Sequence, residues 1–100
     1  MAADVQETTE AAESRAIITV LGSDRPGIVA AVAGALSERA ANILDISQTI
    51  LQGTFTMTML VDLGGAEFSD LRGALDALAE SLGVQINLQR EEVFKFMYRL

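Results

Sequence analysis

Polar and apolar residues alternate in some stretches of the chain and recur at helical spacing in others. Alternation with a period of two predicts half-buried strands over 54–63 and 84–89. Short β-branched or apolar runs predict two further strands over 16–21 and 42–51. Apolar residues that recur every three or four positions predict two amphipathic helices, one ending near Arg39 and one ending at Gly83. The order is therefore strand, helix, strand, strand, helix, strand.

This order describes two strand-helix-strand units joined by a hairpin, with Gln52-Gly53 as the turn. Each crossover is expected to be right-handed, so each unit leaves a gap that a strand of the other can fill. Interleaving the units gives a four-stranded antiparallel sheet of order 4-1-3-2 with both helices on one face. We therefore expect an α+β, ferredoxin-like βαββαβ sandwich with a short C-terminal helix.

The ends of the elements carry their own signals. Asp24 is a candidate N-cap of the first helix, and Pro26 suits its first turn. Ser69 is the expected cap of the second helix, and Gly83 suits the residue that ends it. One face of the second strand is expected to carry three apolar side chains, Leu44, Ile46 and Ile50.

The chain has 100 residues, which is room for one small domain. Residues 1–14 carry four acidic side chains, no basic one and few apolar anchors, so we expect a mobile acidic tail. The folded domain is expected over 15–90. Residues 91–100 are expected to form the terminal helix, acidic at its start and with Arg99 near its end, as the helix dipole favours.

Composition excludes several kinds of chemistry. The chain has no cysteine and no histidine, which excludes zinc fingers, iron-sulfur clusters, thiol nucleophiles and histidine-based triads. Its 14 acidic and 7 basic residues argue against a sequence-independent grip on nucleic acid or an anionic membrane. No run reaches the roughly 18 apolar residues of a membrane span. We expect a cytoplasmic protein with no metal, no cofactor and no catalytic residues.

Other protein families with this fold fit the residues poorly. Copper chaperones need paired cysteines in the first strand-helix loop, and RNA-recognition domains need exposed aromatic residues on the central strands. Acylphosphatases use an arginine in that loop and an asparagine on a later strand. Arg25 and Asn42 could take those places, but a glycine-rich phosphate loop is missing.

The stretch 20–29, Val-Leu-Gly-Ser-Asp-Arg-Pro-Gly-Ile-Val, resembles the opening of the ACT domain, a small regulatory module. Ala41-Asn42-Ile43 falls where that family begins its second strand. The run 42–50, followed by Phe-Thr-Met over 55–57, is similar to the stand-alone single-ACT proteins of bacteria. The chain is also similar to the ACT regions of formyltetrahydrofolate deformylases and of the glycine-cleavage repressor. The resemblance covers about 16–90 and extends to the C-terminus in the stand-alone group, where a histidine is usual at the position of Tyr98.

The resemblance implies that two copies pair and bind a small ligand, commonly an amino acid, near the first strand-helix loop. Free backbone N–H groups at a helix N-terminus give this an independent rationale, because they attract a carboxylate. The candidate ligand-binding residues are Asp24, Arg25, Gly27, Ile28, Val29, Asn42 and Ile43.

Three of these residues have alternative roles. Asp24 could accept an ammonium group, although capping the helix is favoured. Arg25 is favoured as a solvent-facing or acid-paired side chain over a ligand contact. Asn42 could reach a ligand across the subunit interface or hold the turn from helix to strand, and both interpretations stay open.

The expected function is a non-catalytic regulatory module that binds an amino acid or related small metabolite at a homodimer interface. The alternative is a constitutive dimerisation or protein-interaction module without a ligand. Some apolar residues independently favour a dimer, because a core on one side of the sheet has no place for them. They are Leu51, Leu60 and part of the Phe94, Phe96 and Met97 cluster. The regulated partner would then be another chain or the protein's own oligomer.

Overall fold

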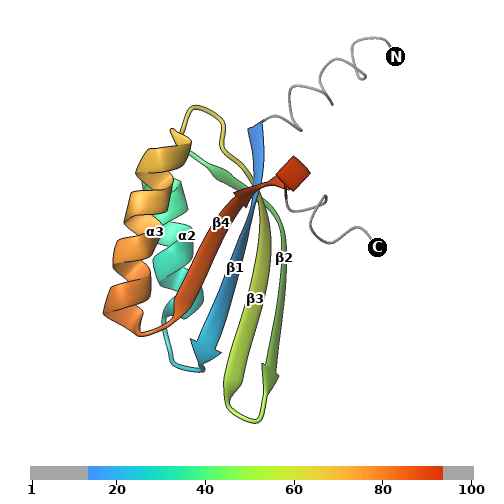
Figure 1. Cartoon of the computed structure of the whole chain (residues 1–100), viewed down its shortest axis with the longest axis vertical. Helices are drawn as coiled ribbons and strands as arrows, with labels where there is room; N and C mark the ends of the chain where they lie inside the picture. Colours follow the sequence, from blue (N-terminus) through green and yellow to red (C-terminus); the bar gives the residue numbers. More distant parts are fainter. Residues whose placement is uncertain (1–13, 94–100) are drawn as a thin grey trace.

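The computed structural model describes residues 14–93, which form a four-stranded sheet with two helices against one face (Figure 1). The elements are β1 (Arg15–Ser23), α2 (Ile28–Glu38), β2 (Asn42–Leu51), β3 (Thr54–Asp62), α3 (Phe68–Leu82) and β4 (Gln85–Arg90). Residues 91–93 add a helical turn after β4. The rest of the predicted terminal helix, 94–100, and residues 1–13 of the predicted tail lie outside the described residues.

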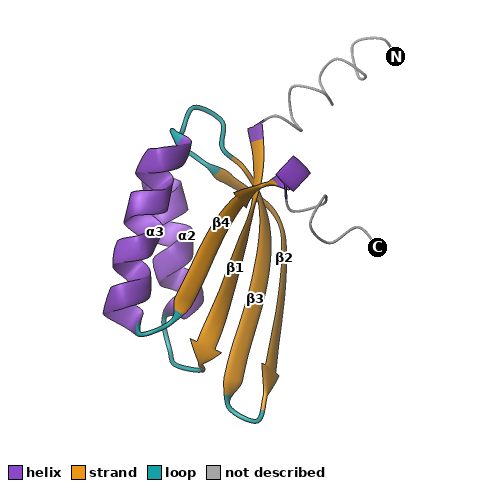
Figure 2. Cartoon of the chain, viewed as in Figure 1, coloured by secondary structure: helices purple, strands orange, loops and turns teal. Residues whose placement is uncertain are grey.

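The sheet order is β2-β3-β1-β4, and every neighbouring pair is antiparallel. Figure 2 shows both helices on the same side of this sheet. The order is the predicted 4-1-3-2 read from the other edge, so the predicted ferredoxin-like sandwich is confirmed.

The core lies between the sheet and the helices. On β3 the alternation is as predicted, because every second residue from Phe55 to Val61 is buried and the threonines between them face the other side. Burial of these apolar side chains is the main stabilising contribution to a domain of this size. The largest side chains with less than 2% exposure come from β1, β3 and both helices: Ile18, Val20, Ile28, Val32, Leu36, Met57, Met59, Val61, Leu71 and Leu75.

Strand β2 departs from the predicted alternation. Ile43 pairs with Val61 and Asp45 pairs with Leu60, so Leu44 is an extra residue in a β-bulge. The predicted alternation is therefore interrupted at Leu44, and Ile43 lies on the same side of the sheet as Ile46 and Ile50. A bulge inserts one residue without a partner, which a strict period of two does not reveal.

Both helices begin at different residues from those predicted. Helix α2 begins at Ile28 and has no side-chain cap, and the Asp24 amide instead donates to the carbonyl oxygen of Gly53 at 2.9 Å. Helix α3 begins at Phe68, one residue before Ser69, whose hydroxyl donates to Glu67 at 2.8 Å. Capping by Asp24 and by Ser69 is thus wrong, because local propensity does not locate the first helical turn to one residue.

Ends of two other elements follow the predictions. Gly83 ends α3 in the left-handed region, with φ of 70°. The β2–β3 turn is formed by Gln52 and Gly53, both at positive φ, as tight hairpin turns require. The sheet therefore has the predicted hairpin.

Candidate functional site

The connection from β1 to α2 lies at one end of the molecule, beside the β2–β3 turn and the start of β4 (Figure 1). Its first residue, Asp24, is held to the turn by the hydrogen bond to Gly53. Its second, Arg25, donates from Nη1 to the carbonyl oxygen of Leu82 at 3.0 Å. The loop is therefore anchored to the hairpin on one side and to the end of α3 on the other.

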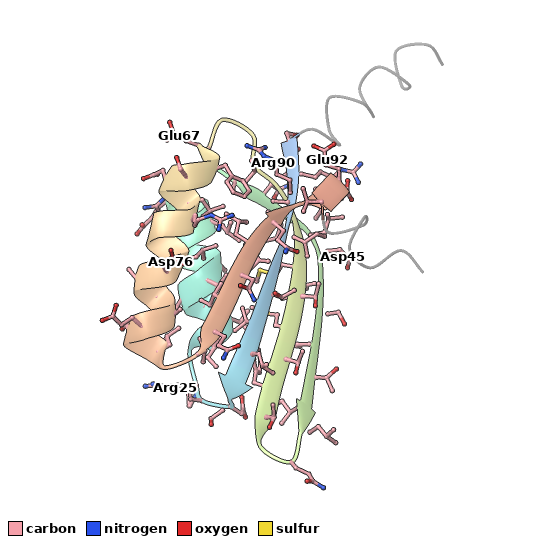
Figure 3. The ribbon with its side chains drawn as sticks, in the orientation of Figure 1. Arg25, Asp45, Glu67, Asp76, Arg90 and Glu92 are labelled. Carbon is pink, nitrogen blue, oxygen red and sulfur yellow. The ribbon has the colours of Figure 1, made fainter. Side chains whose placement is uncertain are left out.

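The structure gives Arg25 a partner that the sequence did not predict. Its side chain is exposed and reaches the end of α3 (Figure 3), where the helix carbonyls carry partial negative charge. Its recorded partner is a backbone carbonyl rather than an acid. Arg25 is thus a residue that positions the loop.

The start of α2 presents backbone donors at this loop. Gly27 has φ of 90°, and its carbonyl accepts the first helical hydrogen bond from Ala31 at 2.9 Å. The N–H groups of Gly27, Ile28 and Val29 precede that bond, so the helix itself supplies no acceptor for them. The first turn of α2 contains no acidic residue and no side-chain cap. These donors are consequently oriented to receive an anion.

The side chains at this helix start play different parts. Ile28 is buried in the core, so only its backbone faces outward. Val29 is half-buried and packs against the core. A Cβ on Gly27 would meet no atom within 4 Å. The positive φ, rather than a neighbouring atom, therefore favours glycine at position 27.

The other two candidate residues, Asn42 and Ile43, lie at the opposite end of the molecule. They begin β2, after the 11 residues of α2, which span about 16 Å. Asn42 is exposed, and Ile43 packs against the core. A cavity of about 430 Å³ between the end of α2 and the start of β2 includes both. One chain alone therefore does not bring Asn42 to the β1–α2 loop.

Strand β2 is an edge strand with an apolar surface. Ile46 and Ile50 pair with Met59 and Phe55, which puts them on the helix side of the sheet, yet they are 40% and 58% exposed. Leu51, at the end of the strand, is 70% exposed.

The charged residue of β2, Asp45, accepts a hydrogen bond from the amide of Ile46 at 2.9 Å. Soluble proteins commonly protect exposed edges with lysine, proline or bulges. The bulge in β2 ends before Ile46, and from there to Leu51 the strand carries none of these devices.

The sheet face away from the helices carries both apolar and polar side chains. Leu60 pairs with Ile17 on β1, and both line a small cavity of about 110 Å³ together with residues of β2. Leu60 is half-buried, and its neighbours on the same face of β3 are Thr58 and Asp62. Leu60, which sequence reasoning left without a place in the core, thus lies on this face.

Residues 14–93 contain neither a cluster of metal ligands nor a membrane-spanning helix. This part of the chain holds no group of three or more His, Cys, Asp or Glu side chains with metal-binding geometry. Nor does either of its helices have the length and apolar character needed to cross a bilayer.

The profile of the ACT domain family matches residues 14–89, which span every strand and helix described above except the last residue of β4. This chain belongs to the ACT domain family. The UPF0237 protein MMP0657 of Methanococcus maripaludis is 50% identical over 86 residues, covering 84% of this chain and 96% of that protein. The ACT domain protein of Streptococcus pneumoniae is 44% identical with a TM-score of 0.71, covering 81% of this chain and 93% of that chain. These ACT relatives are matched over nearly their whole length, as expected of single-domain proteins.

ACT domains within larger proteins are also similar. The regulatory subunit of aspartate kinase from Thermus thermophilus, in its ligand-free form, is 27% identical with a TM-score of 0.63, covering 79% of this chain and 52% of that one. A protein assigned as a glycine cleavage system transcriptional repressor is 25% identical with a TM-score of 0.70, covering 76% of this chain and 44% of that one. Formyltetrahydrofolate deformylase from Burkholderia mallei is 18% identical with a TM-score of 0.72, covering 77% of this chain and 28% of that one. This likeness shows the shared fold alone.

Sequence reasoning missed one contact of the β1–α2 loop, the hydrogen bond from the Asp24 amide to the carbonyl oxygen of Gly53. The turn itself was predicted from Gln52-Gly53. Its contact with the loop depends on the pairing of Ser23 with Thr54 across β1 and β3, which brings together residues far apart in the chain. A local pattern carries no signal for such a contact.

Proposed function

We propose that this ACT protein is a non-catalytic regulatory module that binds an amino acid or a related small metabolite at an interface between two copies. Membership of the ACT family supports a regulatory role. The anchored β1–α2 loop supports the ligand site, because it holds backbone donors at a fixed helix start. No catalytic step is part of the proposal.

The observation that carries the proposal is the separation of the candidate residues between the two ends of β2. Asn42 lies at the start of β2, and the loop lies at the end where β2 finishes (Figure 1). If β2 pairs antiparallel with β2 of a second copy, each start lies beside the other copy's end. Asn42 of the partner subunit would then reach the end of the sheet that carries the β1–α2 loop.

The apolar edge supports the same pairing. Leu44, Ile46, Ile50 and Leu51 are the large exposed apolar residues of β2, and an antiparallel partner strand would cover them. Pairing would also satisfy the outward N–H and C=O groups of the edge. A dimer of this kind assembles two equivalent sites.

Each proposed ligand contact has a chemical role. The N–H groups of Gly27, Ile28 and Val29 would hold the ligand carboxylate. The carboxylate of Asp24, which is exposed and does not cap the helix, would accept the ammonium group.

The partner subunit supplies the remaining contacts. The amide of Asn42 of the partner subunit would bond the ligand across the interface, with Ile43 beside it. Arg25 would act through the loop that it anchors to Leu82.

The first test is the mass of the protein by sedimentation velocity at micromolar concentration. We expect a dimer for the natural sequence and a monomer for Ile50→Lys, because a buried lysine opposes edge pairing. Gln85→Lys adds the same charge at an exposed position on the other edge strand, β4, and should leave the dimer intact. A natural protein that sediments only as a monomer would overturn the proposed interface.

The second test is an amide chemical-shift titration of the labelled dimer with a pool of amino acids, deconvoluted afterwards. Saturable shifts at Gly27, Ile28 and Asn42 are expected, and Ile50→Lys should abolish those at all three. Unmoved spectra with the dimer intact would overturn ligand binding and favour the second class, a constitutive dimerisation or protein-interaction module.

A further inference from the structure

Two arginine side chains contact one phenylalanine ring at the end of the molecule opposite to Arg25. Phe68 is the first residue of α3. The Cζ atom of Arg90, from the end of β4, lies 4.5 Å from the centroid of the Phe68 ring. The Cζ atom of Arg72, one turn along α3, lies 5.0 Å from the same centroid. Figure 3 shows Arg90 at the end of the sheet nearest Glu67, which precedes α3.

Neither of these two guanidinium groups forms an ion pair within residues 14–93, whereas those of Arg15 and Arg39 do. Arg15 pairs with Glu91 at 3.5 Å, and Arg39 pairs with Asp70 at 3.0 Å. Arg72 donates from Nη2 to the carbonyl oxygen of Leu88 at 2.9 Å.

Two acidic side chains close to Phe68 in the sequence have other partners. Glu67 accepts the hydroxyl of Ser69, and Asp70 bonds Arg39 on the α2 side. Within residues 14–93, no carboxylate lies within 4.0 Å of the guanidinium nitrogens of Arg72 or Arg90.

The positive charge at this position is concentrated further by the helix. Phe68 is at the N-terminus of α3, where the backbone dipole contributes partial positive charge. Two guanidinium groups that contact one ring at a helix N-terminus repel one another, and contact with the half-buried ring offsets only part of this cost. A bound anion would remove the repulsion.

A cavity adjoins the two arginines. It has a volume of about 400 Å³ and is lined by Phe68, Arg72, Asn87, Leu88, Gln89, Arg90 and Val93. Strand β4 forms its floor and is an edge strand of the sheet. The carbonyl of Leu88 points away from β1, because it accepts the bond from Arg72. In an antiparallel strand the N–H of the same residue points to the same side, so Leu88 adds an outward backbone donor.

The geometry points to a second ligand site in this cavity, one that binds a small dianion such as a phosphate ester or a dicarboxylate. The guanidinium of Arg90 and the remaining N–H groups of Arg72 would bind the anion through charge-assisted hydrogen bonds, with the Leu88 N–H as a further donor. Phe68 holds both guanidinium groups over its ring and so orients them before the ligand arrives. This site is separate from the β1–α2 loop and does not require the proposed dimer.

The test is a titration of the full-length, isotope-labelled protein with inorganic phosphate and, separately, with succinate, at pH 8 and constant ionic strength. We expect saturable shifts of the Phe68, Leu88 and Arg90 amides and of the Nε–H signals of Arg72 and Arg90, with the Gly27 amide unmoved. Saturation by phosphate alone or by succinate alone identifies which of the two chemistries the site takes. Shifts that grow linearly with both probes, without saturation, would overturn the site.

Matched variants distinguish specific binding in this cavity from a general effect of net charge. Arg90→Gln and Arg72→Gln should each weaken binding at least about tenfold, because each removes charge-assisted hydrogen bonds. Arg90→Lys should bind with intermediate affinity, since it keeps the charge and loses the planar fork. Arg39→Gln makes the same change in net charge next to Asp70 and should leave the affinity within about twofold.

Both arginines to be replaced are exposed, so these variants are expected to fold, and the dispersion of their amide spectra verifies it. Equal weakening in Arg39→Gln and Arg90→Gln would overturn the proposal, because binding would then follow net charge alone. The variants leave the β2 edge and the β1–α2 loop unchanged. A negative result for the anion site is therefore distinct from a negative result for the amino-acid site.

Discussion

Arg25 and Leu82 are joined by a 3.0 Å hydrogen bond from the guanidinium Nη1 to the backbone carbonyl oxygen. The bond connects the loop before α2 to the last residue of α3, 57 positions apart in the chain. Because helix carbonyls at a C-terminus lack intrahelical donors, the arginine both satisfies one of them and fixes the loop. The loop that carries the candidate amino-acid site is thus positioned by the end of the other helix.

Arg25→Met is expected to lower the free energy of unfolding by about 0.5–1 kcal/mol, the contribution of an exposed hydrogen bond to a charged group. Urea denaturation measures this change. Amide shifts are expected in residues 24–29 and at Gly83, and Arg25→Lys should retain part of the contact. A spectrum in which the loop is unchanged would contradict the anchoring role.

Gly22 is required by the close approach of Val84. A Cβ at position 22 would lie 2.7 Å from Cγ1 of Val84, a distance that forces the neighbour to move. Gly22→Ala should therefore destabilise the protein by about 1–3 kcal/mol, the usual cost of overpacking. Thermal unfolding measures the effect.

The control for Gly22→Ala is Gly73→Ala. A Cβ at position 73, inside α3, would meet no atom within 4 Å, so this change should stabilise by up to about 1 kcal/mol through helix propensity. Adding Val84→Ala to Gly22→Ala should restore part of the loss. If the double variant shows only the sum of the two single losses, the clash is not the cause.

Ala40 adopts a left-handed backbone conformation, with φ of 59°, at the end of α2. Its amide donates to Ser37 at 3.1 Å and the next amide, of Ala41, donates to Leu36 at 3.0 Å. This is the position at which glycine commonly ends a helix. Ala40→Gly should raise the free energy of unfolding by up to about 1 kcal/mol, because the strain of a left-handed alanine is removed. A decrease in stability measured by urea denaturation would mean that the extra chain entropy of glycine exceeds that strain.

Leu71 and Leu51 should respond differently to truncation. Leu71 is fully buried, and Leu71→Ala is expected to cost about 2–5 kcal/mol. Leu51 is 70% exposed on the β2 edge, so Leu51→Ala should change monomer stability by less than about 0.5 kcal/mol.

The Leu51 variant also tests the proposed interface. Its midpoint of thermal unfolding should fall relative to the natural protein only at concentrations where the dimer forms, since loss of an interface weakens stabilisation by association. Measurement over a hundredfold range of concentration, about 1–100 μM, is sufficient. A constant difference over that range would place Leu51 outside the interface.

The sequence predicted the fold well where a regular period met a hydrophobic core. The alternation from Phe55 to Val61 held because each slip of one residue would bury a threonine. The predicted course of a strand and the predicted start of a helix were wrong where a single residue decided the backbone geometry. The bulge at Leu44 and the start of α2 after Gly27 each depend on contacts with distant residues.

The residues of the candidate loop site and their assembly across a subunit interface stay predictions, and the structure adds where each residue lies in one chain. Asp24, Arg25, Gly27, Ile28 and Val29 lie together at the start of α2, while Asn42 and Ile43 lie at the other end of the same chain. The cluster of Phe68, Arg72 and Arg90 had no local signal, because Arg90 reaches α3 only after β4 pairs with β1.

The sequence by itself determined the order of the elements, the buried sides of β3 and β4 and the membership of the ACT family. These follow from local periodicity and from a continuous motif, which need no knowledge of distant contacts. Only the tertiary structure decided that Arg25 holds the end of α3, that β2 leaves an apolar edge uncovered and that two arginines meet at Phe68. Each of these depends on strand order, and strand order brings together residues that are far apart along the chain.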